Sequence, residues 1–243
     1  MKLPPSAARN PGMKYARVLL LAAFAVCGAV VVANLTRVPA RADWNWFGGV
    51  RGSGNVVTRT REVEPFTRVS GHGSTDLEID VGRARQSVVV DAEDNIAPLI
   101  ETTVRDGTLS ISAHGAYSSH HGPTVRISVP RLDSVALNGS GDAKIAGARG
   151  SDLELSTFGS GDITAVGEVD RLTYSSSGSG DGRFGGLHAR EAIVRLRGSG
   201  DVHVYATESL DAQTFGSGDV TYGGSPQRVD KKTLGSGEIR GKG

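Results

Sequence analysis

Cysteine is almost absent from this chain of 243 residues, which contains a single one, Cys27. Cys27 lies in an N-terminal leader described below, so the rest of the chain cannot form an internal disulfide. This excludes the small, disulfide-stapled domains that are common among exported proteins. About 200 residues suffice for one domain held by core packing and backbone hydrogen bonds alone. Cys27 follows Val26, where a lipoprotein signal requires a small residue, so no lipid anchor is predicted.

Aromatic residues are also scarce, at 5% of the chain, whereas glycine is abundant, with 34 residues. Of these, 32 lie in the segment 43–243, after the leader. Such a composition favours thin layers of small aliphatic side chains over one thick core. The same segment carries 21 basic and 26 acidic residues, a formal net charge of −5. This charge argues against nucleic-acid binding, which needs clustered positive charge to displace counterions from phosphates.

Residues 1–42 have the pattern of a signal peptide. They contain six basic residues and no acidic one, and an uncharged, mainly apolar stretch runs over 18–36. Residues 40–42, Ala-Arg-Ala, form a small-x-small cleavage site. Translation from Met13 instead of Met1 would give a more compact leader. The leader predicts export to the periplasm, the outer surface or the medium. An uncleaved inner-membrane anchor is the alternative, because the apolar stretch is about as long as the shortest membrane-spanning helices.

The motif Gly-Ser-Gly-Asp recurs at a nearly constant period in residues 134–243. It starts at Gly139, Gly159, Gly178, Gly198 and Gly216, and Gly235 opens the variant Gly-Ser-Gly-Glu. Successive starts are 20, 19, 20, 18 and 19 residues apart. Six occurrences at such regular spacing indicate a repeat architecture.

Apolar residues alternate with polar ones on both sides of each motif, which is the period of a β-strand. In one unit Leu153 and Leu155 precede the motif, and Ile163 and Ala165 follow it, all with the same parity. The motif glycines share this inward parity, where a side chain would collide with the neighbouring coil. The predicted turn glycines are Gly139, Gly141, Gly159, Gly161, Gly178, Gly180, Gly198, Gly200, Gly216, Gly218, Gly235 and Gly237.

The length of the unit selects the fold class. A unit of 18 to 20 residues is too short for a strand-helix-strand crossover, which needs roughly 30 residues. A propeller blade would need about twice the length. The sequence therefore predicts an all-β fold, a parallel β-helix or β-solenoid in which each unit forms one coil of about 19 residues.

Residues 63–133 keep the alternation but lack the motif. Runs such as 77–79 and 125–129 are typical of short strands. The dipeptide at 106–107, Asp-Gly, predicts a hairpin or a tight turn. We expect irregular first coils here, within one solenoid domain over 63–243. An independent small β-domain is the alternative.

The order of several motifs resembles a known bacterial family. The landmarks are Asp91-Ala-Glu-Asp-Asn, Asp106-Gly-Thr-Leu-Ser-Ile, Val125-Arg-Ile-Ser-Val-Pro-Arg-Leu and, after the Gly-Ser-Gly ladders, Val220-Thr-Tyr-Gly-Gly-Ser-Pro. From about Val63 to Ile239 the chain resembles the head GIN domain family, domain of unknown function 2807, whose label is "putative auto-transporter adhesin". The resemblance implies a right-handed parallel β-helix behind a signal peptide, and a surface protein. It brings no catalytic or ligand-binding residues to carry over.

An outward row of acidic residues follows the motif glycines: Asp142, Asp162, Asp181, Asp201, Asp219 and Glu238. Stacked carboxylates about 5 Å apart repel by roughly 1 kcal/mol per neighbour in water, so something must offset them. Calcium is one hypothesis, because it prefers hard oxygen ligands. A structural turn, with the carboxylate accepting amide hydrogen bonds, is the other. We favour the structural turn, because calcium-binding β-roll repeats have a period of about nine residues, which is absent here. A second row on the same face, in which four of the six residues are basic or can become so, also supplies balancing charge: Lys144, Thr164, Arg183, His203, Thr221 and Arg240.

Three of the six histidines lie in the segment 114–122. Zinc or copper binding is one hypothesis for this segment, but the ligand spacing fits no established site. A solvated loop is therefore predicted, and no metal or other cofactor is assigned to the protein.

Both ends of the solenoid carry residues suited to protecting an open edge. Residues 43–62 are predicted to form a linker or cap in which Trp44, Trp46 and Phe47 cover the first coil. Stacking on a sugar and contact with a membrane interface are the alternatives for these aromatic residues. At the other end, the charges that block the last edge are Glu238, Arg240 and Lys242.

The repeat argues against catalysis. Glycoside hydrolysis needs two carboxylates at a defined separation across a cleft, whereas these acids recur identically in every unit. The first hypothesis is a non-catalytic envelope or surface solenoid, adhesin-like or scaffolding, whose partner is a surface glycan or an envelope protein. The alternatives are a carbohydrate-active enzyme, a polysaccharide lyase or hydrolase, on the same fold, and a membrane-anchored periplasmic accessory or sensor protein.

Overall fold

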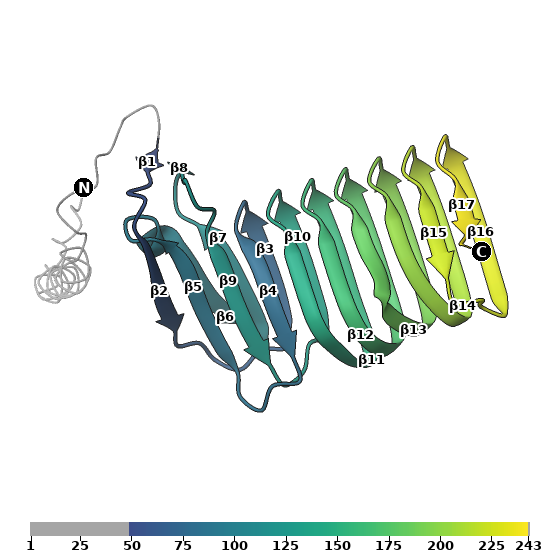
Figure 1. The fold of residues 1–243 in the computed structure, drawn as a ribbon, viewed down its shortest axis with the longest axis horizontal. Coiled ribbons are helices and arrows are strands. Elements are labelled where there is room, and N and C mark those ends of the chain that lie inside the picture. Colours follow the sequence, from purple (N-terminus) through teal and green to yellow (C-terminus); the bar gives the residue numbers. More distant parts are fainter. Residues whose placement is uncertain (1–48, 243) are drawn as a thin grey trace, which may run out of the picture. The chain divides into compact units, whose positions relative to one another are not determined.

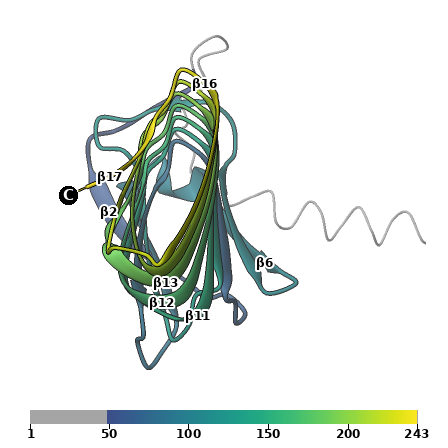
Figure 2. The ribbon, with the colours of Figure 1, turned by 90° about the vertical axis from the view of Figure 1, so that its right-hand side faces the viewer.

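The protein folds as a β-solenoid in the computed structural model, which describes residues 49–242 (Figure 1). Parallel coils stack along one axis, and the view along that axis shows their flattened cross-section (Figure 2). One sheet path links the coils, in the order β17-β15-β14-β13-β12-β11-β10-β3-β7-β6. This confirms the predicted all-β, parallel solenoid.

The strands before the repeats are short, whereas β11 to β14 within the repeats have 15 to 17 residues each. The first group is β1 (Val50–Arg51), β2 (Val56–Arg61), β3 (Arg68–Gly73), β4 (Asp76–Val81), β5 (Ser87–Glu93), β6 (Ile100–Arg105), β7 (Thr108–Ala113), β8 (Tyr117–Ser118) and β9 (Thr124–Val129), with a short 3-10 helix at Ala97–Leu99. The second group is β10 (Ser134–Gly139), β11 (Ala143–Gly159), β12 (Ile163–Gly178), β13 (Gly182–Gly198), β14 (Val202–Gly216), β15 (Val220–Gly223), β16 (Arg228–Gly235) and β17 (Ile239–Gly241).

Each long strand runs from one Gly-Ser-Gly-Asp corner, around the opposite bend, to the next corner. The corners line up along the upper edge of the stack in Figure 1. Equivalent residues are paired in parallel register, so that the first motif glycines form a continuous ladder: Gly139, Gly159, Gly178, Gly198, Gly216 and Gly235.

The core consists of thin layers of inward side chains, as the alternation predicts. Leu155 and Ile163, on the two sides of one corner, are both completely buried. The two largest completely buried side chains are Tyr174 and Phe184, whose ring centroids lie 4.7 Å apart in an edge-to-face arrangement. A Cβ at Gly182 would lie 2.7 Å from the ring of Phe184 and 2.8 Å from that of Tyr174. The glycine that interrupts the apolar pattern at 182 thus makes room for these rings.

The coils before the repeats do not stack in chain order. β3 and β4 form a coil that pairs with β10 and β11 on one side and with β7 and β9 on the other. The first coil along the chain therefore lies second in the stack. We expected irregular coils throughout 63–133, but β5 and β6 run antiparallel to β9 and β7 and form no coil.

The antiparallel strands have a local cause and a structural role. β6 and β7 are joined by the predicted hairpin at Asp106 and Gly107, which have φ values of +49° and +70°. β2 adds antiparallel to β5. Together β2, β5 and β6 cover the outer edge of the β7 and β9 coil, which would otherwise be open to pairing with another chain. Trp44, Trp46 and Phe47, predicted to do this, lie outside the described residues.

Candidate functional site

The predicted turn glycines all lie at the corners of the coils. At Gly159, φ is +141°, and a Cβ would lie 2.1 Å from the carbonyl oxygen of Gly139 in the coil before. At Gly161 a Cβ would lie 2.0 Å from the carbonyl oxygen of Gly141. The backbones of successive corners thus approach so closely that only glycine fits at either position.

The acidic row forms a hydrogen-bonded ladder between coils. Oδ1 of Asp162 accepts a hydrogen bond from the backbone amide of Asp181, and Oδ1 of Asp181 accepts one from the amide of Asp201, both at 2.8 Å. The same bond joins the other neighbours from Asp142 to Glu238. Each aspartate of the row therefore accepts a hydrogen bond from an amide of the following coil. The sequence had instead suggested a hydrogen bond to an amide of the same turn.

The ladder begins one coil earlier than the sequence motif, at Asp76. Its Oδ1 accepts a hydrogen bond from the amide of Asp142 at 2.9 Å. The local sequence, Gly-Ser-Thr-Asp at 73–76, is the motif with Thr75 in place of the second glycine. On the other side of this coil in the stack, the corner position is occupied by the loop between β7 and β9, which lacks the motif. A search for Gly-Ser-x-Asp would have found this rung.

Two arginines of the second predicted row balance the ladder. Arg183 contacts Oδ2 of Asp162 at 2.7 Å and Oδ2 of Asp181 at 3.0 Å. Arg240 pairs in the same way with Asp219 and Glu238, at 3.6 and 3.3 Å. Within residues 49–242 no three His, Cys, Asp or Glu side chains lie close enough to hold a metal ion. In this structure the ladder carboxylates hydrogen-bond one coil to the next.

The histidine-rich loop is anchored by a completely buried carboxylate, Glu93. Oε1 of Glu93 accepts hydrogen bonds from the amides of His120 and His121, at 2.8 and 3.2 Å, and from the hydroxyl of Ser119 at 3.3 Å. Burial alone would raise the pKa of Glu93, but these hydrogen bonds outweigh it and hold the pKa below its ordinary value. The loop is thus held by two backbone amides and the hydroxyl of Ser119, and Nδ1 of the His120 imidazole also lies 3.6 Å from Oε1 of Glu93.

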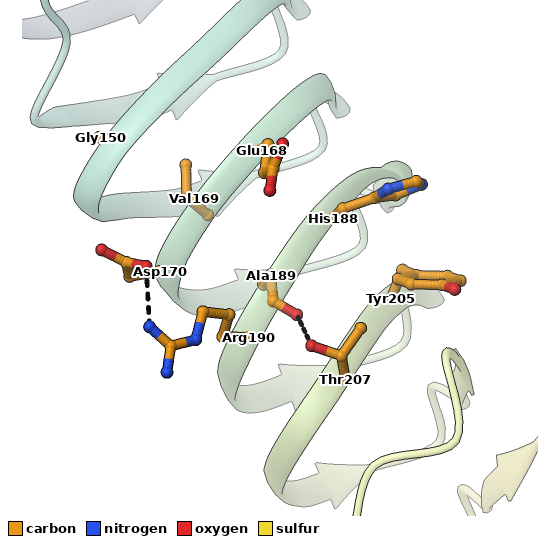
Figure 3. Close-up of a pocket in the computed structure, with 9 residues that line it drawn as sticks. All are labelled: Gly150, Glu168, Val169, Asp170, His188, Ala189, Arg190, Tyr205 and Thr207. Atoms are coloured by element: carbon orange, nitrogen blue, oxygen red, sulfur yellow. Dashed lines mark hydrogen bonds and ion pairs between the residues drawn. The ribbon is translucent and has the colours of Figure 1, made fainter.

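The largest break of register among the described coils lies in β13. Between the pairs Phe184 with Val204 and His188 with Tyr205, residues 185–187 have no partner in β14. Such bulges redirect side chains and are frequent beside functional sites. Here the bulge brings the rings of His188 and Tyr205 into a stack, with centroids 4.5 Å apart and planes 26° apart (Figure 3).

Tyr205 borders two surface hollows. One has a volume of about 260 Å³ and is shown in Figure 3; its lining is Gly150, Glu168, Val169, Asp170, His188, Ala189, Arg190, Tyr205 and Thr207. The other, of about 420 Å³, we call the Tyr205 groove; its lining is Gly185, His203, Val204, Tyr205, Thr221, Tyr222, Gly223, Gly224 and Lys242.

Charged side chains line the first hollow. Arg190 is 3.4 Å from Asp170 (Figure 3) and 2.8 Å from Glu208, and so links three successive coils. Because all three side chains are exposed, these pairs add little to stability. Asp170 and Arg190, two of the charged residues that line the hollow, therefore already have partners.

The Tyr205 groove is open because glycine replaces a side chain next to the ring. Gly223 of β15 pairs with Tyr205, on the side opposite to His188. A Cβ at Gly223 would lie 3.4 Å from Cδ2 of the ring, so any side chain there would cover it. His203 and Thr221 are paired in the adjoining register. One side of the ring therefore remains free beside two polar side chains.

A comparison with known families identifies the fold's relatives. The profile described as "Putative auto-transporter adhesin, head GIN domain" matches residues 65–226. The chain belongs to this family. The crystal structure of a putative adhesin from Bacteroides fragilis is similar to this head GIN domain, with a TM-score of 0.66 and 24% identity over 79% of this chain and 100% of the other. A putative adhesin from Parabacteroides distasonis has a TM-score of 0.51 and 20% identity, over 79% and 99%. No curated protein matches the chain.

The groove was missed by sequence reasoning, although two of its residues, His203 and Thr221, were not. His203 belongs to the predicted outward row, but His188 and Tyr205 carried no motif of their own. The available signals were two glycine doublets, at 185–186 and 223–224, in positions where other units carry side chains. In the structure of this head GIN domain, Gly223 and Gly224 border the ring of Tyr205, and Gly185 lines the same groove.

Proposed function

We propose that this head GIN domain is an exported, non-catalytic protein of the cell envelope that binds a surface partner in the manner of an adhesin. The observation that carries the proposal is the contrast between a rigid, repetitive surface and one interruption of it. Parallel ladders hold the outward side chains at a spacing of about 4.8 Å, and the bulge in β13 adds a ring-lined groove. A preformed surface binds with little loss of conformational entropy.

A non-catalytic role is supported by the use of the acidic residues. Each ladder carboxylate from Asp76 to Asp219 accepts an amide hydrogen bond from the next coil. The exposed acids at the bends, such as Asp170 and Glu208, are paired with arginine. Carboxylates that are bound to other parts of the protein in this way are not positioned to act as an acid, a base or a nucleophile on a substrate.

Export is supported by the leader, with its basic start, apolar stretch and small-x-small site at 40–42. Within residues 49–242 no helix has the length and apolarity to cross a membrane. We therefore place the mature chain in the periplasm, on the outer surface or in the medium, after cleavage.

The test combines processing with binding. The full chain is produced in a bacterial host, fractionated and weighed by intact-mass spectrometry; cleavage near Asp43 is expected. The exported protein is then incubated with cell-envelope fractions, with bovine albumin as the negative control, and saturable binding is expected. Absence of binding to every fraction would overturn the proposal. Turnover of a uronic-acid polymer or another polysaccharide would replace it with the enzyme hypothesis, and retention of the leader with the membrane-anchored one.

A further inference from the structure

The Tyr205 groove has the size and composition of a small-ligand site. Its volume of about 420 Å³ lies within the range of about 300 to 1,000 Å³ that is usual for such sites. Its lining combines the ring of Tyr205 with three polar residues, His203, Thr221 and Lys242. This is the usual pattern of an apolar floor with a few orienting polar groups.

The polar side chains of the groove are free to bind a ligand. Among the described residues, His203, Thr221 and Lys242 have no side-chain hydrogen bond or ion pair to another part of the chain. By contrast, Arg183, one coil earlier than His203 in the same row, is bound to two ladder carboxylates. The donors and acceptors beside Tyr205 are thus the ones that the fold itself does not use.

A pyranose ring matches this arrangement. Its C–H groups form an apolar face that packs on an aromatic ring, while its hydroxyls lie at the rim and need both donors and acceptors. Tyr205 supplies a flat ring whose position is fixed by His188 on one side, and Gly223 leaves the other side open. Thr221 can donate and accept hydrogen bonds, His203 can do either according to its tautomer, and Lys242 donates.

A nucleic-acid base would also stack on a free aromatic ring. The groove, however, lies on β14 and β15, and each of these strands is directly preceded by a ladder carboxylate, Asp201 or Asp219. Segment 43–243 has a formal net charge of −5. A polyphosphate backbone would be repelled here, whereas a glycan brings hydroxyls without that penalty.

We infer that the Tyr205 groove binds a pyranose unit of a surface glycan, with the ring of Tyr205 as its platform and His203 and Thr221 at its rim. The inference rests on the proposed binding function and adds the site and the ligand class. It assigns the bulge in β13 a role, since without residues 185–187 His188 would not support the ring.

The test uses an array of neutral and carboxylated pyranose glycans, followed by titration calorimetry with the best-bound glycan. Tyr205→Ala removes the platform, and Gly223→Val fills the groove from a position where a Cβ makes only ordinary contact with the ring. Each is expected to weaken binding by about tenfold or more. Tyr205→Phe keeps the ring and is expected to bind within about threefold of the unaltered protein.

The matched control is Phe158→Ala. Phe158 is an aromatic residue of β11 that is 54% exposed and lies outside the groove. It is expected to leave glycan binding unchanged, and circular dichroism and melting temperature confirm that each variant is folded.

The possible outcomes separate the site from the general function. Binding to envelope fractions without binding to any glycan, or glycan binding that survives both Tyr205→Ala and Gly223→Val, overturns the groove assignment and leaves the proposed function standing. Failure of the unaltered protein to bind envelope fractions as well as glycans overturns both.

Discussion

The backbone amide of Asp181 donates a hydrogen bond of 2.8 Å to Oδ1 of Asp162, its counterpart in the coil before. The other oxygen of Asp162 binds Arg183, which also reaches Asp181. One carboxylate therefore satisfies an amide of the next coil and is itself neutralised from that coil. This relationship explains why a row of like charges can stabilise a stack that electrostatics alone would push apart.

Replacing Asp162 tests the ladder. Asp162→Ala leaves the amide of Asp181 and one contact of Arg183 without a partner, so the free energy of unfolding should fall by about 1 to 3 kcal/mol. Asp162→Asn keeps an acceptor oxygen and should lose less. Urea unfolding followed by circular dichroism measures both. Asp170→Ala, which breaks a surface pair with Arg190, is the control and should cost less than Asp162→Ala. If Asp162→Ala and Asp170→Ala lowered the free energy of unfolding equally, the ladder hydrogen bond would stabilise the fold no more than a surface ion pair.

Calcium should not be needed for this stability. A site whose Kd lay a hundredfold below the calcium concentration would stabilise the fold by about 2.7 kcal/mol. For a domain of this size that corresponds to a rise in melting temperature of at least about 5 °C. Because Oδ1 of each ladder aspartate already binds an amide, we expect millimolar calcium to change the melting temperature by less than about 2 °C. Calorimetry with calcium and with a chelator measures this, and a rise of many degrees would restore the calcium hypothesis.

Two nearby glycines, Gly180 in the corner before β13 and Gly185 within β13, give opposite expectations for the same substitution. A Cβ at Gly180 would lie 2.1 Å from the carbonyl oxygen of Gly161, so Gly180→Ala must move one corner away from the next. We expect a loss of about 3 kcal/mol or more, or failure to fold. At Gly185 a Cβ meets nothing within 4 Å, and Gly185→Ala should stay within about 0.5 kcal/mol of the unaltered protein. Thermal unfolding compares the pair; similar melting temperatures would contradict the close-approach argument.

The repeats could be predicted from the sequence because spacing and parity act on every coil in the same way. Inward parity at Leu155 and Ile163 specifies burial, and the constant interval between motifs specifies parallel register. The acidic rung at Asp76 was within reach of the same reasoning, since only Thr75 departs from the motif.

The order of the first coils and the groove could not be obtained in this way. Parity shows which side of a strand faces the core but not which strand lies beside it, so β3 and β7 could not be ordered. Likewise, the three extra residues 185–187 fit anywhere around the bend by length alone. Only the paired register shows that they place His188 against Tyr205.

Acid should release the histidine-rich loop. The pKa of Glu93 is lowered in the folded state, because the amide and hydroxyl bonds outweigh the effect of burial. A lowered pKa means that the carboxylate's stabilising contribution is complete above its unfolded pKa, about 4.3, and is lost as the pH falls through the folded value. The exchange rates of the amides of His120 and His121, corrected for intrinsic chemistry, should therefore increase below pH 4.

Glu93→Gln provides the comparison for this effect. It keeps an acceptor oxygen but cannot titrate, so the exchange rates of this loop, corrected for intrinsic chemistry, should lose their acid-dependent step. His120 also contacts this carboxylate, with its Nδ1 3.6 Å from Oε1 of Glu93. His120→Gln in the same experiment separates the two groups. An acid-dependent step that persists in Glu93→Gln would assign it to another residue.

The last described coil carries a lysine on its inner side, and this should keep the open end from pairing with a second molecule. Lys231 occupies the inward register of Ala212 in the previous coil. Its ammonium group lies 4.8 Å from the centre of the Tyr222 ring and donates a hydrogen bond of 3.1 Å to the carbonyl of Ile239. Inward charges are a known means of protecting a sheet edge, because a docking strand would have to bury them.

Lys231→Leu should therefore promote end-to-end association, seen as a concentration-dependent increase in mass by analytical ultracentrifugation. Lys232→Leu, on the outer side of the same strand in register with Gln213, adds the same apolar surface without opening the end of the core. It should remain at the mass of the unaltered protein. If both variants associate equally, added surface hydrophobicity is the cause. If neither does, the edge is protected by its other charges, Arg240 and Glu238, which form an ion pair beside it.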